Sequence, residues 1–143
     1  MVDKVFVDSN LWVYLFSSED NSKYKASEQF ILNNSNKNAL VISYQVINEV
    51  CHVLLRKKFS EQDIQKVIGM MTKICIVQDY SKEISLLASN IRDKYSFSFW
   101  DSHIVASAVT SQCGLLASED MQDGFSFGKM TIRNIFTESF NLL

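Results

Sequence analysis

The sequence predicts an α/β protein with a mostly parallel central sheet of four to five strands flanked by helices. Short apolar runs rich in β-branched residues alternate along the chain with longer segments whose apolar residues recur at helical spacing. No hairpin turn is evident between consecutive strands, so right-handed helical crossovers are expected to join them. The length of 143 residues suits one domain over residues 1–143, large enough to bury a substantial core.

Each predicted strand is a short apolar run bounded by polar or turn-forming residues. The first run ends at Asp8 and passes directly into a helical pattern, and a glycine precedes each of the last two runs. The predicted strands are residues 4–7, 40–42, 74–77, 115–117 and 130–132.

Capping residues and apolar stripes predict the helices. Ser43 is placed to cap a helix that runs to about Arg56, and Ser60 to cap one that runs to about Met71. Ser81 precedes an amphipathic segment over residues 82–94. The other predicted helices begin near Asn10 and cover residues 24–32 and 100–111.

Composition excludes several classes of protein. Apolar residues make up 47% and charged residues 21%, which is typical of globular domains, and the apolar runs are too short to span a bilayer. The first residues lack the basic then apolar layout of a secretion signal, so the cytoplasm is the expected location. The three cysteines lie in separate apolar segments and are expected to be core thiols rather than disulfide or zinc ligands.

The charge balance also constrains function. A net charge of -2 argues against a protein that coats nucleic acid by bulk electrostatics. It is compatible with a nucleic-acid enzyme, because two bound divalent ions would add four positive charges and give a notional +2 at the site.

Four acidic residues stand where a strand ends or on a helix that should face the sheet. Asp8 follows the first strand, and Asp120 follows the fourth by three residues, so both should lie at the edge where parallel sheets bind ligands. Glu49 lies at the margin of the apolar arc of its helix. Asp101 lies in the first turn of its helix, on the line of the buried face.

Converging carboxylates predict a divalent metal site. Two unit charges 4 Å apart repel by about 4 kcal/mol at an effective dielectric constant of 20. A hard cation such as Mg²⁺ or Mn²⁺ relieves this repulsion and prefers oxygen ligands. The local alternatives are a helix cap for Asp8 and Asp101 and a turn residue for Asp120, and the joint placement of the acids favours the metal site.

Two further features have open interpretations. Arg56 shares a polar helix stripe with Glu49, and either a contact with a phosphate or a solvated surface position accounts for it. Phe97, Phe99 and Trp100 flank Asp101 and are expected to be core or dimer contacts rather than platforms for base stacking.

At this point the motifs resemble those of PIN-domain ribonucleases, specifically VapC-type toxins. The similar segments are Val-Phe-Val-Asp8-Ser9-Asn10, Val46-Ile-Asn-Glu49-Val, Trp100-Asp101-Ser-His-Ile-Val-Ala-Ser-Ala and Leu116-Ala-Ser118-Glu-Asp120-Met-Gln-Asp123-Gly. They occur in the family's order along essentially the whole chain. The resemblance implies a PIN-like fold, a Mg²⁺- or Mn²⁺-dependent endoribonuclease, a homodimer, and a small cognate antitoxin that blocks the site.

The resemblance also implies roles for individual residues. Asp8, Glu49, Asp101 and Asp120 match the family's acidic quartet, which holds the metal and performs catalysis. Asp123 matches an additional acid of some members, and Asn10 and Ser118 match polar positions that support the acids. Ser118 stands where the family often has threonine, a change that keeps the hydroxyl.

Two other functions fit parts of the pattern. A phosphoacceptor receiver domain also gathers acids at strand ends, but it needs a lysine at an opposite strand end, which the late strands do not offer convincingly. A catalytically silent PIN-like protein-binding module would keep the fold, but all four acids are present.

Overall fold

The computed structural model describes residues 3–35, 39–137 and 140. In these ranges six strands form one sheet in the order β3-β2-β1-β4-β6-β5, and every pairing is parallel except that of β5 with β6. The predicted fold class is therefore confirmed, but the sheet in these described ranges has six strands in place of the predicted four to five. The strands are β1 (Lys4–Val7), β2 (Leu40–Ser43), β3 (Ile76–Gln78), β4 (Cys113–Ala117), β5 (Ser126–Phe127) and β6 (Met130–Arg133).

The expectation that no hairpin joins consecutive strands is wrong at one edge of the sheet. The two-residue strand β5 pairs antiparallel with β6, and Phe127 lies opposite Met130 across Gly128 and Lys129. Gly128 has φ +58°, a conformation that glycine adopts at little cost in a two-residue hairpin turn. The strand is too short to leave an alternating pattern in the sequence, and the glycine was its only local signal.

Six helices connect the strands in the described ranges. Predicted caps are confirmed for three of them, because the hydroxyls of Ser43, Ser60 and Ser81 each accept a hydrogen bond from the backbone N–H three residues on. Such caps contribute about 1 kcal/mol each. The helices are α1 (Ser9–Ser17), α2 (Asn21–Ser35), α3 (Tyr44–Arg56), α4 (Glu61–Ile74), α5 (Lys82–Lys94) and α6 (Phe99–Thr110).

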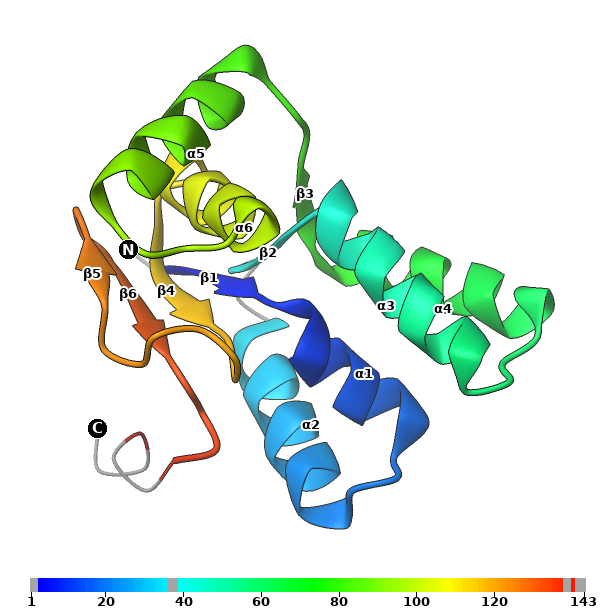
Figure 1. Ribbon diagram of the computed structural model, residues 1–143. Helices are drawn as coiled ribbons and strands as arrows, with labels where there is room; N and C mark the ends of the chain where they lie inside the picture. Colours follow the sequence, from blue (N-terminus) through cyan, green and yellow to red (C-terminus); the bar gives the residue numbers. More distant parts are fainter. Residues whose placement is uncertain (1–2, 36–38, 138–139, 141–143) are drawn as a thin grey trace.

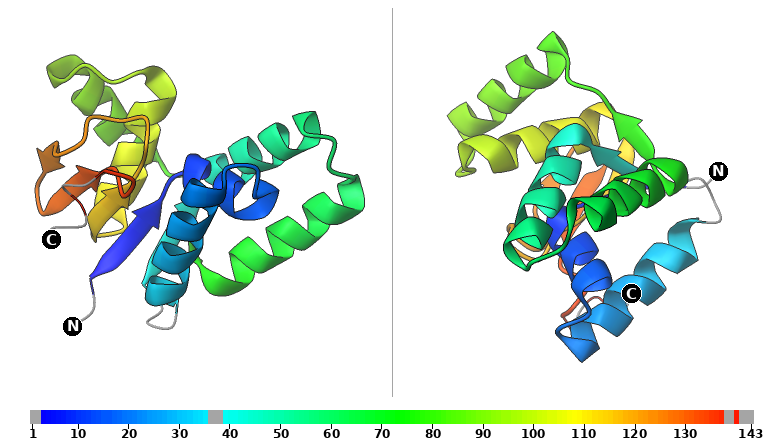
Figure 2. Two further views of the ribbon diagram at one scale, coloured as in Figure 1. Left: turned by 90° about the horizontal axis from the view of Figure 1, so that it is seen from below. Right: turned by 90° about the vertical axis from the view of Figure 1, so that its right-hand side faces the viewer.

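The helices cover the sheet in two groups (Figures 1 and 2). Helices α1 to α4 lie on one face, and α5 and α6 lie on the other. The chain moves from β1 to β2 to β3 in one direction and then returns past them to β4. Because crossovers between parallel strands are right-handed, reversing the direction places the connecting helices on the opposite face.

Burial on both faces explains the composition of the central strands. All four residues of β2 are buried, and Phe6 and Val7 of β1 are fully buried. Burying side chains of this kind contributes roughly 1.5–3 kcal/mol each. Trp12 of α1 is also fully buried, and its Nε1–H donates a 3.2 Å hydrogen bond to the Val7 carbonyl, which fixes the start of α1 against the end of β1.

The cysteines are unpaired, and the helices are short. Cys51, Cys75 and Cys113 are free thiols, and burial raises the pKa of Cys75 and of Cys113 to about 12, so these two thiols are held in their protonated form. Within the described part of the chain, no helix has the length and apolar character needed to cross a membrane.

Candidate active site

The candidate site lies where the direction of strand crossing reverses, at the carboxyl ends of β1 and β4. These strands are parallel neighbours, and Val7 lies opposite Ala117 at their ends. Asp8 and Ser118 follow these two residues and therefore emerge side by side. In open α/β sheets this reversal point is where ligands bind.

Asp8 is held by two donors in a buried position. Its side chain is only 6% exposed, and it accepts 2.8 Å and 2.7 Å hydrogen bonds from the Ser118 hydroxyl and the Ser9 N–H. The Ser9 contact makes Asp8 the N-cap of α1, so the capping role and the proposed site role belong to the same side chain.

Burial and negative neighbours control the ionisation of Asp8. The pKa of Asp8 is raised to about 6, mainly by burial and in smaller part by the charges of Glu49 and Asp101, while the bonds from Ser118 and Ser9 lower it. A cation that binds beside Asp8 would therefore stabilise the ionised form of its carboxyl group.

Glu49 is positioned by residues from two helices. The Ser9 hydroxyl donates a 3.0 Å bond to Glu49 Oε2, so Ser9 bridges Asp8 and Glu49. Gln45, one turn earlier on α3, donates a 2.8 Å bond to Glu49 Oε1 and a 3.2 Å bond to the Trp100 carbonyl. Ser9 and Gln45 were missed as site residues, although the spacing of four between Gln45 and Glu49 was a usable signal.

Asp101 and Asp120 complete the acidic group. Asp101 is half-buried in the first turn of α6, and its pKa is raised by burial first and then by the charges of Glu49 and Asp120. Asp120 is exposed in the loop after β4 and accepts a 3.3 Å bond from Asn10 Nδ2. Asn10 also accepts a 3.4 Å bond from the Glu119 N–H, which ties this loop to α1.

A second network, not predicted from the sequence, anchors the loop that carries Asp120. The Tyr14 hydroxyl donates a 2.5 Å bond to Glu119 Oε1, and the Lys23 ammonium forms an ion pair with Glu119 Oε2. Lys23 also lies over the rings of Tyr14 and Phe136, at 5.0 and 5.6 Å from their centroids. The loop is thus held by residues of α1 and α2.

Two predicted residues stand apart from the acidic group. The Asp123 carboxylate accepts bonds from Arg133 Nε at 3.1 Å and from the Asn134 N–H at 2.9 Å, and the pKa of Asp123 is lowered by the Asn134 bond first and by Arg133 as well. Arg56 is exposed at the end of α3. Seven residues separate it from Glu49, which is about 10 Å along the helix axis.

The three aromatic residues near Asp101, which were predicted to be core or dimer contacts, divide into one core residue and two exposed ones. Phe97 packs against the core and against Phe125. Phe99 and Trp100, in contrast, are 52% and 57% exposed. They lie in the first turn of α6, before the helix enters its fully buried stretch.

The acids fit a hard divalent cation by their chemistry. They offer only oxygen donors, and burial, together with the charges of neighbouring acids, raises the pKa of Asp8 and of Asp101. Among the described residues, no three His, Cys, Asp or Glu side chains are placed so that they could by themselves hold an ion. Water or a substrate oxygen would therefore have to complete the coordination of an ion bound here.

Two hollows border the acids. One, of about 340 Å³, is lined by Gln45, Asn48, Glu49, Tyr80 and Trp100. The other, of about 320 Å³, is lined by Ser9, Asn10, Val13, Tyr14, Val53, Glu119 and Asp120. Each hollow includes one of the four acids, so a chain-like ligand over the acids would have space on both sides.

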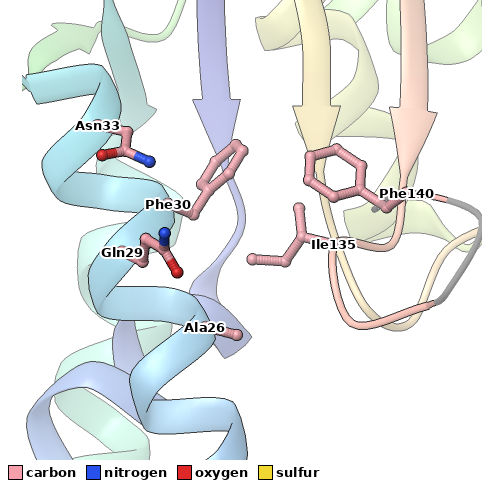
Figure 3. A pocket seen from close by; sticks show the side chains of 6 residues that line it. All are labelled: Ala26, Gln29, Phe30, Asn33, Ile135 and Phe140. Carbon is pink, nitrogen blue, oxygen red and sulfur yellow. The ribbon is translucent and has the colours of Figure 1, made fainter. Parts of the chain in front are cut away.

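A third cavity has no acidic lining residue among those described. It measures about 220 Å³ and lies between α2 and the segment after β6 (Figure 3). Its lining residues are Ala26, Gln29, Phe30, Asn33, Ile135 and Phe140. The Phe30 and Phe140 rings meet there at a centroid distance of 5.9 Å. This lining is apolar and amide in character, unlike the acidic group.

The fold and the acidic group at the reversal point define a class of α/β proteins with a negatively charged site at the carboxyl edge of a parallel sheet. Residues 5–126 match the PIN domain family. The protein therefore belongs to the PIN domain family. No curated protein sequence matches the chain at a significant level.

Solved structures with the same fold include a toxin and toxin–antitoxin complexes. The DNA-bound VapBC complex of Salmonella typhimurium has a TM-score of 0.68 at 16% identity, over 94% of this chain and 99% of the matched one. A toxin–antitoxin complex of Klebsiella pneumoniae has a TM-score of 0.67 at 18% identity, over 90% and 96%. VapC20 of Mycobacterium tuberculosis, a toxin that cleaves the sarcin–ricin loop, has a TM-score of 0.64 at 17% identity, over 79% and 87%. At these identities the likeness establishes the fold.

Proposed function

We propose that the protein is an endoribonuclease that depends on Mg²⁺ or Mn²⁺ and serves as the toxin of a type II toxin–antitoxin pair. The observation that carries this proposal is the acidic group at the reversal point of a PIN-domain sheet, where the charges of Glu49 and Asp101 act on the buried Asp8. The cleavage of the sarcin–ricin loop by VapC20, which shares the fold, supports RNA as the substrate.

The proposed ligands are Asp8, Glu49, Asp101 and Asp120. When bound there, a divalent ion supplies an activated water and neutralises charge on the phosphodiester. The chain itself orients the ligands: Ser118 and Ser9 hold Asp8, and Gln45 holds Glu49.

Supporting roles are proposed for three further residues. Asn10 orients Asp120 through its 3.3 Å bond. Asp123, the fifth predicted acid, is proposed as a further ligand, and its Oδ1 also pairs with Arg133 Nε. Arg56 is assigned a contact with an RNA phosphate further along the substrate, because a guanidinium matches phosphate oxygens.

The partners follow from the same proposal. Complexes from Klebsiella pneumoniae and Salmonella typhimurium pair the similar fold with an antitoxin, which supports a small cognate antitoxin here. A homodimer in the cytoplasm is the proposed form of the free toxin. A neighbouring reading frame that encodes a small protein with a DNA-binding N-terminus would support this pairing.

The alternative is a catalytically silent module that only binds proteins. The match to the PIN domain family excludes the receiver-domain alternative. The silent module is disfavoured because all four predicted acids are present, and the charges of Glu49 and Asp101 act on the buried Asp8.

Cleavage assays separate these two functions. Purified protein is incubated with structured and transfer RNAs in Mg²⁺, in Mn²⁺ and in chelator, and an Asp101→Asn variant prepared in parallel controls for contaminating nuclease. We expect cleavage only with the ions and only in the wild type. Equal cleavage in chelator would contradict the metal role, and inactivity across a broad panel of RNAs would favour the silent module.

A further inference from the structure

An exposed aromatic pair lines the hollow beside Glu49. Trp100 is 57% exposed and Tyr80 is 54% exposed, and both line the cavity of about 340 Å³. Trp100 precedes Asp101 at the start of α6, and Tyr80 lies between β3 and α5. Exposed aromatic rings leave a large apolar surface in water. A ligand that covers these rings would bury that surface, which favours binding.

Hydrogen bonds connect this hollow to the acidic group. Glu49 lines the hollow. The Gln45 amide donates at 2.8 Å to Glu49 and at 3.2 Å to the Trp100 carbonyl, so the backbone of Trp100 is fixed relative to the acid. A ligand group that enters the hollow therefore lies next to whatever binds at the carboxylates.

Two neighbouring rings lie close to the Trp100 ring. It meets the Phe99 ring edge-on at 5.0 Å and 86° and lies 5.8 Å from the His103 ring. Phe99 in turn packs under the Arg92 guanidinium, at 4.6 Å, and Arg92 donates a 2.8 Å bond to Ser102. This stack restricts the Trp100 side chain, which reduces the entropy lost when a ligand stacks on it.

The chemistry of the hollow fits a nucleobase. It combines two aromatic side chains with the exposed amide of Asn48, and aromatic faces and amides are what single-stranded RNA readers offer to bases. The protein carries a net charge of -2, so bulk attraction for phosphates is weak. Stacking needs no charge and therefore suits a substrate that must approach an acidic site.

We propose that this hollow binds an unpaired nucleobase of the RNA, stacked on Trp100 and Tyr80, adjacent to the phosphodiester at the acids. The inference rests on the proposed nuclease function and deepens it by assigning a base-binding subsite to Trp100 and Tyr80. A base inside a continuous duplex is paired and stacked and cannot enter. The substrates are therefore single strands or loops.

Tryptophan fluorescence tests the stacking without any cleavage. Trp12 is fully buried, so Trp100 is the tryptophan that an RNA can reach. Short single-stranded RNA, or the same strand annealed to its complement, is titrated in chelator. We expect quenching of the wild type by the single strand and little by the duplex. Trp100→Phe should lose the quenching but keep most of the affinity.

Affinity measurements in the same buffer give the size of the effect. Trp100→Ala and Tyr80→Ala should each bind the single strand roughly 5- to 150-fold more weakly. Leu86→Ala is the matched control, because Leu86 is 56% exposed on α5 and does not line the hollow. Unchanged affinity in both aromatic variants, or equal quenching by the duplex, would overturn the proposal. Tyr80→Ala carries the test alone if Trp100→Ala does not fold.

Cleavage assays and light scattering distinguish base binding in the hollow from the nuclease function and from a dimer contact at Trp100. If the wild type cleaves RNA with Mn²⁺ and Trp100→Ala cleaves at the same rate, the base-binding hollow is wrong and the nuclease function stands. If the wild type does not cleave but binding depends on Trp100, the hollow stands and the nuclease function fails. Light scattering tests whether Trp100 is a dimer contact instead. If the wild type is a dimer that RNA does not quench, and Trp100→Ala is a monomer, Trp100 is a dimer contact and the proposal is overturned.

Discussion

The hydroxyl of Ser118 donates a 2.8 Å hydrogen bond to the carboxylate of Asp8, from a position 110 residues further along the chain. The contact exists because β1 and β4 are parallel neighbours that end in register. Ser118 is fully buried, and its bond lowers the pKa of Asp8, but burial has the larger effect and the pKa remains raised, at about 6. Ser118 therefore keeps Asp8 available as an anion.

Replacing Ser118 should weaken metal binding most at low pH. In Ser118→Ala the pKa of Asp8 rises further, so protons compete more strongly with Mn²⁺ below neutral pH. Calorimetric titration with Mn²⁺ at pH 6 and pH 8 measures the effect. Ser118→Thr keeps the hydroxyl and is the control. An equal loss at both pH values, or a Thr variant no better than Ala, would contradict this role.

Amide replacements of Asp8 and Asp101 should abolish cleavage without loss of stability. Asparagine removes the negative charge and a hard ligand, and it also removes like-charge repulsion from Glu49. The melting temperature in metal-free buffer is expected to hold or rise for both variants. A clear fall in melting temperature together with lost activity would indicate a structural role, such as the cap that Asp8 provides to α1.

The stability of the metal-free protein should fall as pH rises through the pKa of Asp8. The folded pKa is about 6 and the reference value is 3.8, so the folded state binds the proton more tightly. This contribution is fully present below about pH 4 and is lost through pH 6, and its size is about 3 kcal/mol at most. Urea unfolding from pH 4 to 8 measures it. Asp8→Asn should flatten the curve, and parallel curves for the two proteins would contradict the assignment.

The Asp123→Asn variant should show whether Asp123 acts mainly as the ion-pair partner of Arg133 or as a metal ligand. The pair with Arg133 is partly exposed, so its loss should cost about 1 kcal/mol or less. If the pair is the main role of Asp123, affinity for Mn²⁺ stays near that of the wild type. A loss of affinity as large as that of Asp101→Asn would instead place Asp123 among the ligands.

Arg56→Ala should weaken RNA binding and flatten its dependence on salt by roughly one unit of slope. Affinity for Mn²⁺ should not change, because Arg56 lies at the far end of α3 from Glu49. Arg56→Lys should restore only part of the affinity, since lysine lacks the bidentate fork. Unchanged affinity for both RNA and antitoxin would leave Arg56 as a solvated surface residue.

Much of the fold could be predicted because its signals are local. The caps at Ser43, Ser60 and Ser81 are made within one helical turn, and the central strands are buried on both faces and so read as continuous apolar runs. The exceptions have a local cause too. Strand β5 is two residues long, and α2 begins three residues before the predicted start, at Asn21, in a stretch of polar residues.

The sequence by itself determined that Asp8 and Asp120 follow parallel strands and that Glu49 and Asp101 lie on helices facing the sheet, because these placements depend on periodicity and on strand ends. Only the tertiary structure decided which side chains hold them. The bonds from Ser9 to Glu49, from Gln45 to the Trp100 carbonyl and from Lys23 to Glu119 join separate elements. They depend on how helices pack against one another, as does the exposure of Trp100, and no local pattern in the sequence encodes that packing.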